Sequence, residues 1–207
     1  MRIINGDSLK PSDKYFLECA KIHSKEIPSG FLPTLGLSFL SSLYEFFSKS
    51  KYSFLLMAVE DSKVMGFIVI SLHTKLFFKQ YLWTQSYKNF HKIPLSIFGK
   101  MFIVKTIEVF KYSFKSKKVK TDFVSNSEIL NFCVDSSVQG RGVGQLLFSK
   151  AVDELKSSKV KVLKIVTGQK QISAQNFYYK SGATFSHKVM VHKGEESVVF
   201  KYKINGV

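Results

Sequence analysis

The sequence is poor in cysteine and in acidic residues, and it lacks long apolar runs. Its two cysteines, Cys19 and Cys133, stand far apart in 207 residues, so we expect no disulfide framework. No apolar run reaches the roughly 20 residues that cross a bilayer, because lysines interrupt the apolar stretches of the first half. The opening residues, Met1 to Asp7, lack the apolar core of a signal peptide. We therefore expect a chain of the reducing cytoplasm.

The shortage of acidic residues leaves a large positive charge. Lys and Arg number 31 against 15 Asp and Glu, a formal net charge of +16 at pH 7. This surplus favours phosphate-bearing partners, which include nucleotide cofactors, anionic lipid surfaces and nucleic acid. The hydrophobic share of 45% is ordinary for a globular protein, and the length suits one domain over residues 1–207.

Apolar periodicity predicts the elements of the first part of the chain. Side chains at helical spacing, with Pro11 in the first turn, predict a helix over residues 9–26. A second amphipathic stripe runs from Phe39 to about Lys51. Apolar, β-branched runs at 52–59 and 64–72 enclose a turn-forming stretch and predict an antiparallel hairpin.

Residues 74–120 differ in character from the rest of the chain. Phe, Tyr and Ile are interleaved there with 11 lysines and one acidic residue, Glu108, and Pro94 divides the segment. We expect a basic helical insertion. Such a segment serves as a solvated face, a membrane-surface helix, a partner groove or a nucleic-acid patch. We favour a wall of the substrate site with peripheral contact to an anionic membrane, with plain packing as the alternative.

The last third alternates strands and helices. We expect strands over 129–134, 160–166, 185–192 and 197–204, and helices over 142–156 and 172–180, the second of which ends at Gly182.

A glycine-rich loop, Gln139-Gly140-Arg141-Gly142-Val143-Gly144, joins the first of these strands to a helix. Its glycines let backbone N–H groups approach a ligand, and the positive end of the helix dipole faces the same place. Arg141 adds a fixed charge and Gln139 a side-chain donor. The spacing matches neither the P-loop nor the dinucleotide fingerprint. The loop is therefore expected to hold a pyrophosphate.

The pattern Gln139-x-x-Gly142-x-Gly144 resembles the acyl-CoA signature of the GNAT superfamily. The later run from Ala174 through Phe177 and Tyr178 to Gly182 is similar to a second pattern of the same family, and the resemblance covers about residues 120 to 204. It implies a mixed α/β fold with a mostly antiparallel sheet of six to seven strands, helices on both faces and a splayed parallel pair at the CoA site. It also implies an N-acetyltransferase in which an amine attacks acetyl-CoA directly in a ternary complex.

The resemblance assigns roles to particular positions. Tyr178 stands where the family often has a general acid that protonates the CoA thiolate, and Glu128 stands where some members have the base that deprotonates the amine. Gln171 departs from the family, which often has Asn there. The implied cofactor-binding set is the strand residues Phe132, Cys133 and Val134, whose backbone would pair with pantetheine, the loop residues Gln139, Gly140, Arg141, Gly142, Val143 and Gly144, and Asn176.

Other candidates are less favoured. Asp135 competes with Glu128 as the base, and Cys133 fits a small buried residue better than a nucleophile. The five histidines show no metal-ligand spacing, so no metal is expected.

The acceptor is a separate question. The run from His23 to Tyr44 is similar to GNAT proteins associated with surface-polysaccharide synthesis, which implies an amino sugar carried on a nucleotide or on a membrane lipid. We also expect peripheral contact with the inner face of the membrane. Acetylation of a protein or of another small amine is an alternative. A different class is a non-catalytic GNAT-like module that binds membrane or nucleic acid through residues 74–120. A homodimer stays open.

Overall fold

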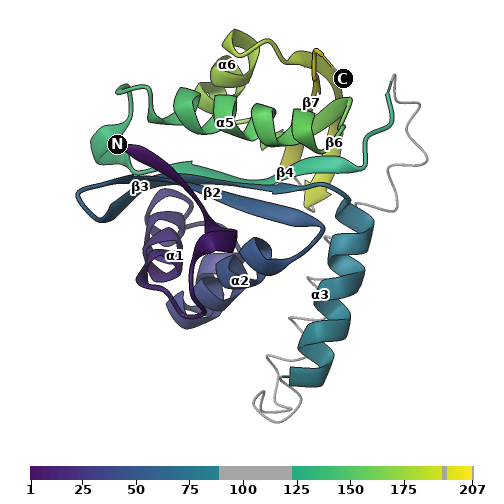
Figure 1. Cartoon of the computed structure of the whole chain (residues 1–207). Helices are drawn as coiled ribbons and strands as arrows, with labels where there is room; N and C mark the ends of the chain where they lie inside the picture. The colour runs from purple at the N-terminus through teal and green to yellow at the C-terminus, as the bar shows by residue number, and fades with distance from the viewer. Residues whose placement is uncertain (89–122, 193–194, 207) are drawn as a thin grey trace.

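Seven strands form one sheet in the computed structural model, which describes residues 1–88, 123–192 and 195–206 (Figure 1). The order of the strands across the sheet is β1-β2-β3-β4-β5-β7-β6. The strands are β1 (Arg2–Asn5), β2 (Ser53–Glu60), β3 (Lys63–Ser71), β4 (Ser127–Val134), β5 (Val162–Gly168), β6 (Thr184–His192) and β7 (Glu195–Lys203).

Helices cover both faces of this sheet, as the sequence predicted. Helices α1 (Lys14–Glu26) and α2 (Leu37–Lys49) lie on one face, and α5 (Val143–Ser157) and α6 (Ile172–Lys180) lie on the other (Figure 1). Helix α3 (Thr74–Lys88) leaves the sheet directly after β3. Three short 3-10 turns complete the described elements: η1 (Gly6–Ser8), η2 (Leu32–Leu35) and η4 (Ser136–Val138).

The sheet separates two apolar cores. Alternate side chains of a strand point to opposite faces, so Leu55 and Met57 of β2 join α1 and α2, whereas Leu56 and Ala58 join α5. Because both faces are covered, β2 is buried along nearly its whole length. This explains why β2 reads as a continuous apolar run rather than an alternating one.

Most of the predicted elements are confirmed within two or three residues, and the 172–180 helix has the predicted bounds. The start of the first helix was wrong. Asp13 accepts a hydrogen bond from the Tyr15 N–H and caps the helix, which therefore begins at Lys14 and leaves Pro11 in the preceding turn. Strand β1 was not predicted. It is a four-residue edge strand that pairs with β2.

The predicted parallel pair is formed by β4 and β5. These strands pair only at Ser127 with Leu163 and at Glu128 with Lys164. Beyond Glu128, β4 continues against β3, with an irregularity opposite Val69, while β5 continues against β7. The two strands therefore diverge, and we call the opening between them the fork. The predicted 74–120 insertion begins as the helix α3, and its residues 89–120 lie outside the described part.

Candidate active site

The fork exposes one edge of β4. From Ile129 to Val134 this strand has no partner strand on its β5 side among the described residues. Backbone N–H and C=O groups there, apart from the Val134 carbonyl, can therefore pair with a ligand. Phe132 points toward α6, where its ring lies 5.5 Å from that of Phe177. Cys133 points to the opposite core, and burial raises the pKa of its thiol to about 12. The thiol therefore stays protonated, and Cys133 can offer only its backbone to a cofactor.

The glycine loop opens beyond the end of β4. Gly140 and Gly142 both have φ of +80°, a conformation that L side chains rarely adopt. Gly142 precedes the first turn of α5, and no side chain caps that helix end. The first N–H groups of α5 are thus available to an anion, with the helix dipole behind them. A pyrophosphate fits this arrangement. Val143, the first residue of α5, is buried, and Gly144 packs beside Phe177 and Phe132.

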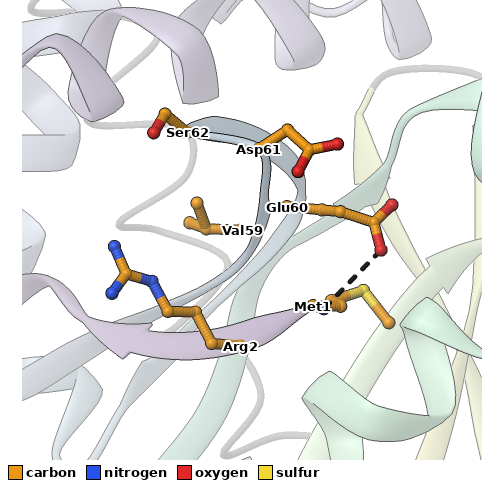
Figure 2. Close-up of a pocket in the computed structure, with 6 residues that line it drawn as sticks. All are labelled: Met1, Arg2, Val59, Glu60, Asp61 and Ser62. Carbon is orange, nitrogen blue, oxygen red and sulfur yellow. Dashed lines mark ion pairs between the residues drawn. The ribbon is translucent and has the colours of Figure 1, made fainter.

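The two polar side chains of the loop are already engaged. Gln139 donates from Nε2 to the Val134 carbonyl at 3.0 Å, which fastens the loop to the end of β4. Arg141 Nη2 lies 3.2 Å from Oε2 of Glu60 at the end of β2. The Glu60 carboxylate also pairs with the amino group of Met1 at 3.6 Å (Figure 2). The Arg141 side chain is 58% exposed, so a phosphate at the loop would either share its guanidinium with Glu60 or replace Glu60.

Figure 2 shows the small pocket around Glu60. It is lined by Met1, Arg2, Val59, Glu60, Asp61 and Ser62. They come from the start of the chain and β1, from the end of β2 and from the β2–β3 turn, so the pocket lies outside the fork.

Glu128 occupies the last paired position before the fork opens. Its side chain is buried, and Oε2 lies 2.7 Å from Nζ of Lys164 on β5. Burial raises the pKa of the Glu128 carboxyl, and the charge of Lys164 opposes that rise. Sequence reasoning missed Lys164. The available signal was a lone lysine inside an otherwise apolar strand, which often marks a paired charge.

Tyr178 lies in the core on the α5 side of the sheet. It is 6% exposed and packs among Phe132, Phe148, Phe177 and Phe200. Burial raises the pKa of its phenol well above the ordinary value. The group therefore remains protonated throughout the neutral range.

Two further positions named from the sequence lie on α6 or directly before it. Asn176 is exposed on α6. Gln171 accepts hydrogen bonds from the Thr167 hydroxyl at 2.7 Å and from the Gly168 N–H at 3.0 Å. The residue that departs from the family pattern thus fixes the turn between β5 and α6.

Asp135 serves as a turn-forming residue. Its carboxylate accepts from the Ser137 hydroxyl and N–H and pairs with Lys25 at 3.0 Å. These contacts hold the pKa of Asp135 down at about 2. A carboxylate of such low basicity is a poor general base, which leaves Glu128 as the better candidate.

A buried polar cluster on β4 was missed by sequence reasoning. The Tyr44 hydroxyl lies 2.6 Å from Nδ1 of His23, and Asn131 Nδ2 lies within 3.0 Å of both groups. Burial lowers the pKa of His23 to about 4. The cluster links α1, α2 and the segment of β4 at the fork. No local sequence pattern predicts a contact between residues so far apart in the chain.

Among the described residues, no group of three or more His, Cys, Asp or Glu side chains could hold a metal ion. No described helix is long and apolar enough to cross a membrane.

Comparison with known proteins adds independent findings. Residues 107–183 match the family model described as the acetyltransferase (GNAT) family. No curated protein sequence matches the chain.

Three solved structures illustrate the structural likeness. An aminoglycoside 6'-N-acetyltransferase complexed with coenzyme A has a TM-score of 0.62 at 12% identity, over 100% of this chain and 99% of that one. A GNAT-family protein from Desulfovibrio desulfuricans has a TM-score of 0.60 at 11% identity, over 98% and 99%. The ribosomal-protein-S18-alanine N-acetyltransferase of Escherichia coli has a TM-score of 0.55 at 12% identity, over 100% and 96%.

Identities this low establish the fold alone. The sequence match, however, spans the fork strand, the glycine loop and α6, which are the elements that form the site. Residues 107–183 are thus similar to the GNAT acetyltransferases, which are acyl-CoA N-acyltransferases, and the chain has the mixed α/β GNAT fold.

Proposed function

We propose that the chain transfers the acetyl group of acetyl-CoA to a primary amine by direct attack in a ternary complex. The observation that carries this proposal is the fork: β4 and β5 share two paired positions and then diverge, and an uncapped helix end follows β4. An extended pantetheine arm with two amides suits the free edge of β4, and a pyrophosphate suits the first turn of α5.

The amine nitrogen attacks the thioester carbonyl, the new N–C bond forms, the C–S bond breaks, and the thiolate of CoA leaves. The nitrogen then loses a second proton, to the departing thiolate or to water, so the products are the amide and CoA. An ammonium must first lose a proton, since its nitrogen has no free electron pair. Free N–H groups at the edge of β4 would donate to the carbonyl oxygen as it gains charge.

Glu128 is the proposed acceptor of that ammonium proton, directly or through a water molecule. Its position at the base of the fork and its buried setting support this role. Burial raises the pKa of its carboxyl, which makes it a stronger base, and the charge of Lys164 opposes that rise. Lys164 is a positioning residue in this scheme, because it holds the carboxylate at 2.7 Å.

Tyr178 is the proposed partner of the leaving thiolate. A phenol whose pKa is raised by burial remains a donor at neutral pH. Such a group stabilises the thiolate better by donating a hydrogen bond than by giving up its proton completely, because the thiol is the stronger acid. The general-acid role is thus proposed in this weaker form.

We further propose that the acceptor is an amino sugar carried on a phosphate-bearing group. The net charge of +16 supports an anionic substrate, since polycationic amines are repelled by such a surface. The aminoglycoside 6'-N-acetyltransferase of similar fold supports an amine on a sugar. The E. coli relative, which acts on a ribosomal protein, makes a protein N-terminus the main competitor.

Two experiments test this function. Calorimetric titration with acetyl-CoA and desulfo-CoA should give one site per chain, and ATP should give none at a salt concentration that suppresses loose binding. Absence of CoA binding would remove the proposal altogether. Release of free CoA is then measured with amino-sugar nucleotides, lipid-linked amino sugars, polyamines and peptide N-termini. Turnover with peptides or polyamines alone would refute the amino-sugar acceptor and keep the acetyltransferase.

A further inference from the structure

One face of α3 presents apolar side chains to solvent. Leu76 is 38% exposed, Leu82 43% and Trp83 77%. Lys79 is exposed between them along the helix. Spacings of three, four and seven residues bring these positions to the same side of a helix. We call these four residues the α3 outer face.

The opposite side of α3 is fixed in the protein, so the outer face cannot turn inward. Phe77 stacks on Phe47 of α2 with ring centroids 5.2 Å apart, and Tyr81 meets Phe46 edge-on at 5.0 Å. At the start of the helix, the Thr74 N–H and hydroxyl both donate to the Asn126 carbonyl, at 2.8 and 3.0 Å. The apolar exposure of the outer face is therefore a built feature of the fold.

The charge of this region suits an anionic surface. Helix α3 contains no Asp or Glu among its 15 residues, and the whole chain carries a net charge of +16. Lysine in the middle of an apolar face can keep its ammonium in the headgroup region while its stem follows the apolar neighbours. Tryptophan prefers the same boundary between water and lipid.

The side chains of the α3 outer face favour one kind of partner over the others that a basic surface could bind. Nucleic acid single strands need several stacking side chains, whereas two of the three apolar residues here are leucines. A stable dimer needs a larger apolar area than three side chains supply. Shallow insertion of a few apolar side chains, strengthened by lysine, is sufficient for peripheral attachment to a bilayer.

We propose that the α3 outer face docks on the surface of an anionic lipid bilayer. Leu76, Leu82 and Trp83 enter the boundary between headgroups and acyl chains, about 5–10 Å deep, and Lys79 pairs with lipid phosphates. The helix lies on the membrane and does not cross it, in keeping with its 15 residues. This docking is independent of acetyl transfer and is measured without acetyl-CoA.

The chain offers an internal probe, because Trp83 is its single tryptophan. Vesicles of phosphatidylcholine containing phosphatidylglycerol should shift Trp83 emission to the blue, and bromine-labelled acyl chains should quench it. Vesicles of phosphatidylcholine alone should leave emission nearly unchanged, and salt should weaken the effect. The proposal fails if the protein sediments with anionic vesicles while Trp83 emission stays unchanged, if no sedimentation occurs, or if only a single-stranded oligonucleotide shifts the emission.

Variants separate the apolar and charged contributions. Replacing both Leu76 and Leu82 with Ser should lower vesicle partitioning about tenfold, since two half-exposed leucines lose their transfer into lipid. Lys79→Gln should lower it about fivefold. Matched controls on α6 are Ile172→Ser, which is 58% exposed, and Lys180→Gln. Equal losses in the controls and the α3 variants would overturn the assignment to this face.

Discussion

The Glu128–Lys164 pair places two opposite charges where little water reaches them. Their side chains are 11% and 16% exposed. Withdrawing charges from water is costly, and mutual attraction offsets that cost only while both partners are present. A change at either residue therefore affects folding as well as chemistry, and the two effects have to be measured separately.

Glu128→Gln should lower kcat by about a hundredfold, since it removes the proposed base while it keeps the shape of the side chain. The KM for acetyl-CoA should change little. The same variant should lose up to about 3 kcal/mol of stability, because the buried ion pair between Glu128 and Lys164 is broken. Steady-state kinetics and thermal melting monitored by circular dichroism measure the two effects. Full turnover under conditions where chemistry is rate-limiting would exclude Glu128 as the base.

Tyr178→Phe should leave the melting temperature nearly unchanged, because the ring packing is retained and no described residue is hydrogen-bonded to the hydroxyl. It should lower kcat by about a hundredfold if the phenol supports the leaving thiolate. Tyr179→Phe is the matched control, since this neighbour is 50% exposed on the same helix. Equal rates in the two variants would remove Tyr178 from the mechanism.

His23 gives the fold a dependence on pH. Burial lowers its pKa from 6.5 to about 4, so below pH 6.5 the unfolded chain binds a proton that the folded chain rejects. Stability from this group is full above pH 6.5 and falls as pH drops from 6.5 toward 4, by about 3 kcal/mol in total. His23→Gln should flatten this part of the melting profile between pH 7 and pH 4. An unchanged slope would show that other groups control it.

The glycine loop is an element in which backbone conformation carries the function. A Cβ on Gly142 would meet no atom within 4 Å, so its need for glycine comes from the φ of +80°. Gly142→Ala should cost about 1 kcal/mol of stability and weaken acetyl-CoA binding measurably. Gly36 has φ of +88° and ψ of 161°, a conformation restricted to glycine, so Gly36→Ala should cost at least as much stability and leave binding intact. Calorimetric titration of both variants with acetyl-CoA makes the comparison.

Elements with local signals were predictable from the sequence. The hairpin of β2 and β3, the strand-loop-helix unit at β4 and α5, and the bounds of α6 follow from periodicity, turn residues and glycine. Strand β1 was not predicted because its four residues show no clear alternation of apolar and polar side chains. The contacts of Glu128 with Lys164, of Arg141 with Glu60 and of His23 with Tyr44 depend on how distant strands and helices align. One sequence contains no signal for such alignment.

The molecule as a whole consists of two partial sheets joined at a narrow place. Strands β1 to β4 form one part and β5, β7 and β6 the other, and only two paired positions connect them. A bound pantetheine arm would add hydrogen bonds to β4 at the open end. Acetyl-CoA at a hundred times its Kd should raise stability by about 2.7 kcal/mol, measured as a shift of the melting temperature. ATP at the same concentration is the control, and an equal shift with ATP would indicate nonspecific anion binding.

The fork has consequences for the release of CoA and for the resistance of the chain to proteolysis. If the co-substrate replaces the missing strand pairing, the edge of β4 is fully hydrogen-bonded only while CoA or its acetyl ester is bound. The hydrogen bonds between β4 and CoA would then break each time CoA leaves. Release of CoA would then compete with the acetyl-transfer step for control of the rate. The chain should then resist proteolysis better with either CoA or acetyl-CoA bound than with neither.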